Sequence, residues 1–267
     1  MKIITINSKG GVGKSTTSMQ IIAPFLYQLN GKQKVKFAEL DDENQDSTTF
    51  SGSDLIEAQQ IQITGTDLDS KLLDLIIDND NIIIDVGGNK TTTFVIESLS
   101  NTGIINALDL IVIPLGDGEQ DASNAIKLYN WIRELNNDIK IIFALSRIDP
   151  SMDLEMQFFD FFGDKQGRID DRPGLIDKIN LADQNIIKVR NSDIIKYSRA
   201  FGITAYELSE IDIIEVKEKM KQALTKKEKK DDPRIKKLAY RQTVLNKAAD
   251  YRQTVLEPAF EVLRTLV

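Results

Sequence analysis

The stretch "KIITINSKGGVGKSTT", residues 2–17, constrains the fold more than any other part of the sequence. Its first residues form a short apolar run, which predicts a buried strand. A loop containing Gly10, Gly11 and Gly13 follows, and residues 15–30 then have helical spacing. Glycines allow consecutive backbone N–H groups to turn toward an anion, and the start of a helix adds a positive dipole. The strand, loop and helix therefore predict a phosphate-binding loop.

The end of this loop carries chemistry of its own. Gly13, Lys14 and Ser15 match the end of the pattern G-x-x-x-x-G-K-[ST], although Ser8 stands where the first glycine belongs. In that pattern the lysine reaches the β- and γ-phosphates of a nucleotide, and the hydroxyl ligates Mg²⁺. Thr16 is expected to cap the helix or to contact the α-phosphate.

The 267-residue chain contains neither cysteine nor histidine. This composition excludes thiolate and histidine metal sites, iron–sulfur ligation by cysteine, and nucleophile triads that need histidine. Any metal must be held by oxygen atoms, which favours Mg²⁺. General acid–base work falls to Asp, Glu, Lys or Tyr.

Apolar runs that lack polar alternation recur along the first part of the chain, as expected for parallel strands that are buried on both faces. Helical patterns lie between them. This alternation predicts an α/β fold, a doubly wound and mostly parallel sheet with helices on both faces, and ligands bound at the carboxyl ends of the strands. The expected strands are 2–7, 34–40, 81–86, 109–114, 139–146 and 185–190, and the expected helices are 15–30, 67–78, 90–101 and 119–136.

From about residue 205 the pattern becomes helical. We therefore expect an α/β domain over 1–210 and a helical C-terminal extension over 211–267, packed on the same domain. Pro24 lies inside the first predicted helix and is expected to kink it. The segment "YRQTVL" occurs at 240–245 and again at 251–256. An offset of eleven residues is almost three helical turns, so both copies face the same way, either for packing or for a partner.

The segment "KGGVGKST" resembles the deviant Walker A motif, K-G-G-x-x-G-K-[ST], of the ParA/MinD family of P-loop ATPases. The resemblance implies that ATP and Mg²⁺ bind here and that ATP closes a homodimer. Lys14 then serves its own subunit's nucleotide, and Lys9 reaches the neighbour's; a solvated loop lysine is the alternative for Lys9. The implied nucleotide contacts are Gly10, Gly11, Val12, Gly13, Lys14, Ser15 and Thr16.

Two acidic segments also resemble the family. In "KFAELDDENQ", Asp41 takes the position that orients the attacking water and lies near the metal. Glu39 replaces the first acid of the family's D-x-D-P-Q pattern, and its role stays open. "NIIIDVGG" resembles Walker B, with Asp85 near Mg²⁺ and glycines where the family commonly has prolines. The implied metal site is Ser15, Asp41 and Asp85, and the implied catalytic groups are Lys9, Lys14 and Asp41.

Contacts to the base are less specific. In the family they come from the loop after a later strand and from a Pro-Arg-like segment further on. The corresponding segments here are "ALSRIDP" and "KVRNSD", so that Arg147, Arg190 and Asn191 are candidates for contacts to adenine or ribose. The resemblance covers roughly residues 1–210.

The distribution of charge along the sequence indicates what the protein binds. The formal net charge is −7, yet residues 217–247 contain twelve Lys/Arg and four Asp/Glu, a net +8, on a body of net −15. Within the family this favours a short ParA-like partition ATPase that binds DNA non-specifically in its ATP state and is stimulated by a cargo-bound ParB-like activator. The candidate DNA contacts are Lys226, Lys227, Lys229, Lys230, Arg234, Lys236 and Lys237.

A MinD-like role at a membrane, or a conjugation-linked role in positioning cargo, is the alternative. The end "AFEVLRTLV" has apolar residues at helical spacing but only one arginine, a poor cationic face for anionic lipid, so packing on the body is favoured. The apolar runs in the first half are too short to span a bilayer, and no signal peptide is evident. We expect a cytoplasmic, nucleoid-associated protein.

Overall fold

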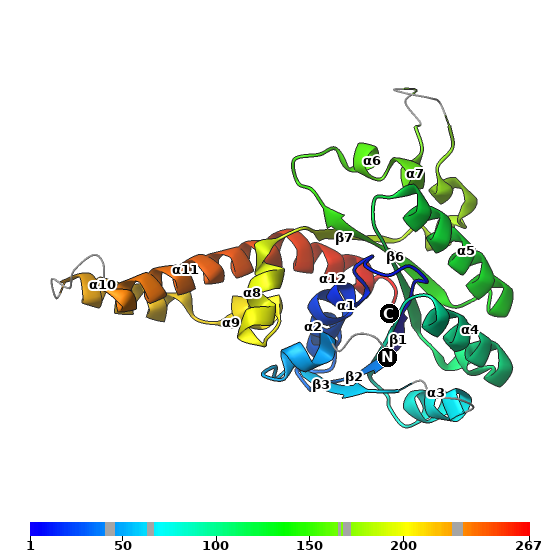
Figure 1. The fold of residues 1–267 in the computed structure, drawn as a ribbon, viewed down its shortest axis with the longest axis horizontal. Helices are drawn as coiled ribbons and strands as arrows, with labels where there is room; N and C mark the ends of the chain where they lie inside the picture. The colour runs from blue at the N-terminus through cyan, green and yellow to red at the C-terminus, as the bar shows by residue number, and fades with distance from the viewer. Residues whose placement is uncertain (41–45, 63–66, 165–166, 168–171, 226–231) are drawn as a thin grey trace.

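A computed structural model describes the whole chain except residues 41–45, 63–66, 165–166, 168–171 and 226–231 (Figure 1). Its centre is a seven-stranded sheet in the order β3-β2-β4-β1-β5-β6-β7, in which every pairing is parallel. The strands are β1 Lys2–Thr5, β2 Val35–Leu40, β3 Ile56–Gln60, β4 Ile82–Val86, β5 Leu110–Leu115, β6 Lys140–Ile148 and β7 Ile186–Arg190.

All six predicted strands are present, which confirms the α/β prediction. Strand β3 was not predicted. Its sequence is "IEAQQ", and every residue after Ile56 is exposed. An edge strand whose side chains are exposed on both faces lacks the continuous apolar run by which buried parallel strands are recognised.

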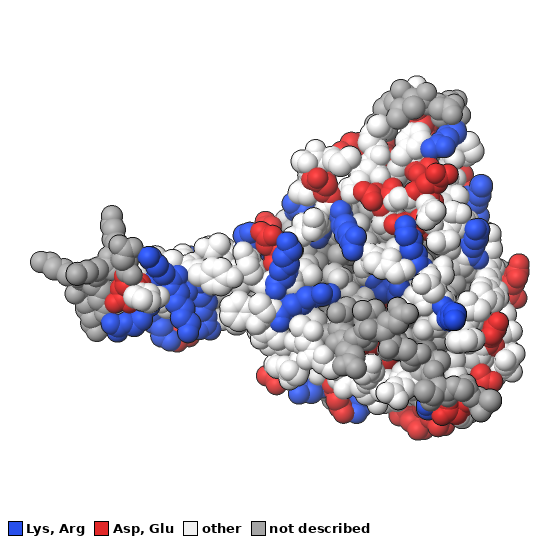
Figure 2. All heavy atoms as spheres, viewed as in Figure 1, with Lys and Arg blue, Asp and Glu red and all other residues white. Residues whose placement is uncertain are grey.

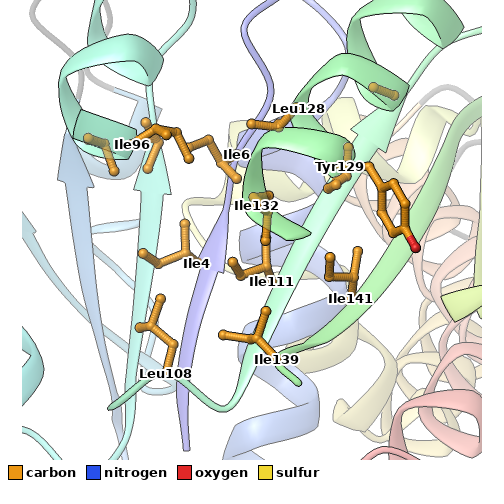
Figure 3. Close-up of a cluster of buried hydrophobic side chains, with 14 of the residues drawn as sticks. Ile4, Ile6, Ile96, Leu108, Ile111, Leu128, Tyr129, Ile132, Ile139 and Ile141 are labelled. Carbon is orange, nitrogen blue, oxygen red and sulfur yellow. The ribbon is translucent and has the colours of Figure 1, made fainter. Parts of the chain in front are cut away.

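Helices cover both faces of the sheet, as predicted. Consecutive residues of β1 show the division: Ile4 packs with helices α3, α4 and α5, whereas Ile3 packs with the helix after the phosphate loop and with the C-terminal helices. Figure 3 shows the first of these two cores, in which Ile96 of α4 lies beside Ile6 and Ile132 of α5 lies beside Ile111 of β5. The helices of that layer are α3 Leu68–Ile77, α4 Lys90–Thr102 and α5 Glu119–Leu135.

The first helix is interrupted in a different way from the expected kink. Helix α1 Lys14–Thr17 continues through a π-helical turn, Ser18–Ile22, into α2 Ala23–Leu29, and Pro24 stands in the first turn of α2. A second π-helical turn, Arg252–Leu256, precedes Pro258 in α12. Proline has no N–H to donate, and in both places the backbone changes its hydrogen-bond register just before it.

The C-terminal part is divided between the body and a projecting arm (Figure 1). Helix α10 packs along the first part of α11, and this pair, which we call the arm, extends away from the sheet. The end of α11 and α12 return to the body, where Phe260 and Leu263 are fully buried. The elements are α8 Asp193–Phe201, α9 Ala205–Glu210, α10 Ile213–Thr225, α11 Pro233–Tyr251 and α12 Glu257–Arg264.

The two "YRQTVL" copies agree only in part. Val244 and Leu245 of the first copy and Val255 and Leu256 of the second are all buried. The tyrosines differ, because Tyr240 lies on the arm and is 51% exposed whereas Tyr251 is 1% exposed in the body. Both copies therefore bury the same Val-Leu pair. Whether the tyrosine is buried depends on whether it lies on the arm or in the body.

Short elements complete the chain. Between β6 and β7, helix α7 and the 3-10 turn Leu175–Lys178 pack beside α5. None of the described helices is both long enough and apolar enough to cross a membrane. The remaining elements are the helices α6 Leu154–Gln157 and α7 Phe159–Phe162 and the 3-10 turns Asp46–Phe50, Ile104–Ala107, Leu175–Lys178 and Leu181–Asp183.

Candidate nucleotide site

The loop between β1 and α1 has a backbone that requires glycine at two positions. Gly11 has φ +75° and Gly13 has φ +87°, both in the left-handed region. A Cβ atom on Gly13 would lie 2.9 Å from the Cβ of Ser146, so a side chain has no room there. No described side chain caps the N terminus of α1. Its first N–H groups and its dipole are therefore directed at the space that the loop encloses.

Neighbouring strand ends hold this loop in place. The side-chain amide of Asn7 donates to the carbonyl of Pro114 at 2.7 Å, and its oxygen accepts from the N–H of Lys9 at 2.9 Å. The hydroxyl of Ser146 donates to the carbonyl of Val12 at 2.7 Å. These contacts join the loop to β5 and β6, so its shape depends on the assembled sheet.

The two lysines of the loop differ in environment. The ammonium of Lys14 donates to the carbonyl of Lys9 at 3.0 Å, and Lys14 is 9% exposed. The ammonium of Lys9 instead forms an ion pair with Asp121 at the start of α5. Asp121 was not predicted as a site residue, and nothing local in the sequence marks it. Only the parallel pairing of β1 with β5 brings the two loops together.

The predicted Walker B carboxylate lies directly behind α1. Asp85 is 3% exposed and accepts a hydrogen bond from the hydroxyl of Ser18 at 2.9 Å. Burial raises the pKa of Asp85 to about 7, against the opposing effects of hydrogen bonds from Ser15 and Ser18 and of the Lys14 ammonium. Ser15, Lys14 and Asp85 are thus brought together as predicted. Ser18 was missed, although it lies one helical turn after the motif.

Glu39 is a buried strand residue and not a solvated turn acid. It is 1% exposed and is the register partner of Asp85 on β2. Its negative charge contributes to the raised pKa of Asp85. Two carboxylates side by side in a buried site favour a bound positive charge between or beside them. Asp41, the predicted water-orienting residue, lies outside the described residues.

The donor set fits Mg²⁺ held mainly by a nucleotide. The described part of the site offers the Ser15 hydroxyl and the Asp85 carboxylate, both oxygen ligands. Among the described residues, no group of three or more Asp and Glu is arranged to hold a metal by itself. Mg²⁺ in phosphate-transfer sites is commonly bound by one or two protein oxygens plus phosphate oxygens and water. A buried carboxylate whose pKa lies near 7 is a group that a cation would stabilise in its charged form.

The loop after β4 packs against the phosphate loop. A Cβ on Gly88 would lie 3.3 Å from the N–H nitrogen of Gly10. The N–H of Asn89 donates to the carbonyl of Ser8 at 2.5 Å, and the Thr92 hydroxyl donates to the carbonyls of Gly87 and Asn7. The absence of a side chain at Gly88 thus permits close approach of this loop to the phosphate loop. Thr92 is a contact that sequence reasoning missed.

The three residues predicted for the base lie at neighbouring strand ends but face different surroundings. Ile148, the last residue of β6, is the register partner of Arg190, the last residue of β7, and Arg147 directly precedes Ile148. Arg147 has φ +60° and approaches the phosphate loop, where a Cβ on Gly11 would lie 3.9 Å from its guanidinium. A cavity of about 500 Å³ lies between the start of α8 and α11, lined by Asn191, Ser192, Asp193, Lys196, Asn246, Lys247 and Asp250.

The predicted DNA contacts fall at the outer end of the arm. Arg234, Lys236 and Lys237 are exposed at the start of α11. On the face shown in Figure 2, Lys and Arg side chains gather on the outer part of the arm. Lys226, Lys227, Lys229 and Lys230 lie outside the described residues.

Comparison with known proteins gave matches among solved structures. No family model matches the sequence, and no curated protein matches it. A plasmid partition protein from Borrelia burgdorferi is 19% identical, with a TM-score of 0.44 over 75% of this chain and 96% of that one. McdA from Cyanthece is 17% identical, with a TM-score of 0.45 over 78% and 92%. The cell division ATPase MinD from Pyrococcus furiosus is 12% identical, with a TM-score of 0.45 over 92% and 98%.

Proposed function

We propose that this chain is an ATPase of the ParA/MinD type that dimerises on ATP and positions or segregates DNA. One observation carries the proposal. A loop whose shape requires glycine at positions 11 and 13 leads directly into Lys14 and the uncapped N terminus of α1, and the buried carboxylate of Asp85 lies beside that helix. Convergent N–H groups, an ammonium and a buried acid form a site for a phosphate chain and its cation.

The chemistry follows from these groups. The N–H groups of residues 10–16 bind the phosphate oxygens, and the Lys14 ammonium neutralises charge on the β- and γ-phosphates. Mg²⁺, when bound through Ser15 and Asp85, supplies further neutralisation of phosphate charge. Water attacks the γ-phosphorus in line as the bond to the bridging oxygen breaks, giving ADP and phosphate. Asp41 is proposed to position that water, and no covalent intermediate is needed.

Lys9 is proposed to act across the dimer interface. Its side chain is 37% exposed, and its ammonium pairs with Asp121 of its own chain. The ammonium of such a lysine can leave Asp121 and bind the phosphates of the nucleotide in a neighbouring subunit. Such a charge supplied in trans acts as an arginine finger does.

The arm is the proposed DNA-binding surface. It carries most of the basic segment, 217–247, while the rest of the chain is strongly acidic. The negative charge of the body repels DNA, so a duplex would contact the arm. Lys and Arg side chains there would bind backbone phosphates, independently of the base sequence. A cargo-bound ParB-like activator and a nucleoid-associated, cytoplasmic location complete the proposal.

Binding to non-specific duplex DNA tests this function. We expect binding with ATP but not with ADP or without nucleotide, and an affinity that falls on the order of 10³-fold between about 50 and 200 mM salt if about six phosphates are contacted. The triple variant Arg234→Gln, Lys236→Gln, Lys237→Gln should bind more weakly and with a smaller salt dependence. The control is Lys127→Gln, Lys178→Gln, Lys188→Gln, which removes the same charge from exposed positions on the body.

Absence of ATP-dependent binding would overturn the DNA role and turn attention to membranes or to conjugation-linked cargo. The membrane alternative needs an exposed apolar helix face at the C terminus. In the structure Phe260 and Leu263 of α12 are fully buried, so that face is already covered. Co-sedimentation with anionic vesicles, with and without ATP, distinguishes the two surfaces.

A further inference from the structure

We propose that Arg147 contacts the phosphate chain of the nucleotide and not its base. The inference rests on the proposed nucleotide site and revises the role that sequence reasoning suggested for this residue. It depends on where a local irregularity in strand β6 directs the arginine side chain.

Arg147 occupies a strained backbone position. Its φ of +60° is uncommon for a residue with a long side chain and costs conformational energy. The strand pairing explains its origin, because Ser146 pairs with Val189 and Ile148 pairs with Arg190, the residue directly after Val189. Arg147 is therefore the extra residue of a β-bulge, a feature that redirects a side chain.

The surrounding structure holds this conformation in place. The side-chain amide of Gln157 donates to the carbonyl of Arg147 at 3.2 Å and to the carboxylate of Asp117 at 3.1 Å. The oxygen of the same amide accepts from the N–H of Asp149 at 2.9 Å. Gln157 is 8% exposed. A buried glutamine that joins residues 147–149 to Asp117 stabilises the backbone conformation of the bulge.

The bulge directs the guanidinium to the phosphate loop. A guanidinium nitrogen of Arg147 lies 3.9 Å from the position that a Cβ on Gly11 would take. The preceding residue, Ser146, donates a hydrogen bond to the carbonyl of Val12 in the same loop. Within the described part of the chain, no carboxylate forms an ion pair with Arg147. A guanidinium at the edge of a phosphate-binding loop is suited to bind two phosphate oxygens at once.

Binding of ATP and of inorganic triphosphate, each with Mg²⁺, separates the two roles. If Arg147 contacts phosphates, Arg147→Ala should weaken both ligands by a similar factor, about 10- to 100-fold for a lost charged hydrogen bond. Arg147→Lys should recover part of the loss for both. Adenosine binding, measured by competition, should not change.

A base or ribose contact predicts the opposite pattern, weaker ATP and adenosine with unchanged triphosphate, and that result would overturn the inference. Unchanged ATP binding in Arg147→Ala would overturn it as well. Arg190→Ala is the matched control at the neighbouring strand end and should not affect inorganic triphosphate if Arg190 contacts the base. Failure of the unmodified protein to bind any nucleotide would overturn the proposed function together with this inference.

A second pair of variants tests the strain independently of ligand. Arg147→Gly and Arg147→Ala both lack the guanidinium, but only glycine adopts positive φ without cost. Arg147→Gly should melt about 2–4 °C above Arg147→Ala, with the same loss of triphosphate affinity. A lower melting temperature for the glycine variant would show that the bulge is not strained and would remove the structural basis of the proposal.

Discussion

Lys9 in the phosphate loop forms an ion pair with Asp121 in the first turn of α5 of its own chain. The pair depends on Gly116, because a Cβ there would lie 2.4 Å from the Asp121 carboxylate. A lysine cannot hold this carboxylate and reach a neighbouring subunit's phosphates at the same time. The ion pair therefore competes with the proposed role of Lys9 in trans.

Weakening that ion pair should favour the ATP-bound dimer. Asp121→Asn frees the Lys9 ammonium, and partly exposed ion pairs are worth up to about 1 kcal/mol, so the dimer should tighten about 2- to 5-fold. Sedimentation equilibrium with ATP and without nucleotide measures the effect. Glu119→Gln, which removes one negative charge from an exposed position in the same helical turn, is the control. A weaker dimer in Asp121→Asn alone would show that Asp121 supports assembly.

The two loop lysines should fail differently when removed. Lys14→Ala is expected to abolish ATP binding or turnover, because its nearly buried ammonium lies across the loop. Lys9→Ala should retain much of the ATP affinity but lose dimerisation and hydrolysis. Fluorescent-nucleotide titration and size-exclusion chromatography with ATP separate the outcomes. A Lys9→Ala protein that dimerises as the unmodified protein does would exclude the role in trans.

Asp85 should make the nucleotide-free protein less stable as the pH rises. Its pKa is raised from 3.8 to about 7, so the folded chain holds a proton there that the unfolded chain has lost. The free energy of unfolding therefore falls between about pH 4 and pH 7, by at most about 4 kcal/mol. In Asp85→Asn no carboxyl group titrates at this position, so the free energy of unfolding does not fall in this way. The variant should therefore gain stability relative to the unmodified protein when the pH is raised from 5 to 8. Urea unfolding at both pH values measures this, and an equal difference at both would refute it.

Tyr251 carries a buried hydroxyl that has no hydrogen-bond partner among the described residues. Burial raises its pKa and leaves the group desolvated. Tyr251→Phe should stabilise the protein by about 1 kcal/mol, because it removes an unsatisfied polar atom without a change of shape. Tyr240→Phe, the same change in the exposed copy of the repeat, should alter stability by less than about 0.5 kcal/mol. Destabilisation by Tyr251→Phe would mean that the hydroxyl is bonded, for instance to water.

The phosphate loop and the buried strands could be predicted because each depends on the chemistry of a short stretch of sequence. The phosphate loop could be predicted because glycine alone tolerates the backbone at Gly11 and Gly13, and because Lys14 and Ser15 follow at a constant spacing. The buried strands could be predicted because parallel strands need continuous apolar runs. β3 was not predicted because its residues after Ile56 are exposed, so it has no continuous apolar run.

Contacts between distant segments could not be predicted in this way. Nothing near Asp121 in the sequence indicates Lys9, and nothing near Gln157 indicates that its amide stabilises the bulge at Arg147. The two "YRQTVL" copies are identical in sequence, yet one tyrosine is exposed and the other is buried. Each of these outcomes depends on which elements pack together.

The sequence by itself determined the phosphate loop, the parallel α/β architecture and the separation of a basic segment from an acidic body, because backbone sterics, apolar periodicity and charge are properties of short stretches. The tertiary structure alone decided that Lys9 pairs with Asp121, that Arg147 points to the phosphate loop, and that α10 and the first part of α11 project as an arm. Those depend on strand order and helix packing, which join residues that are far apart along the chain.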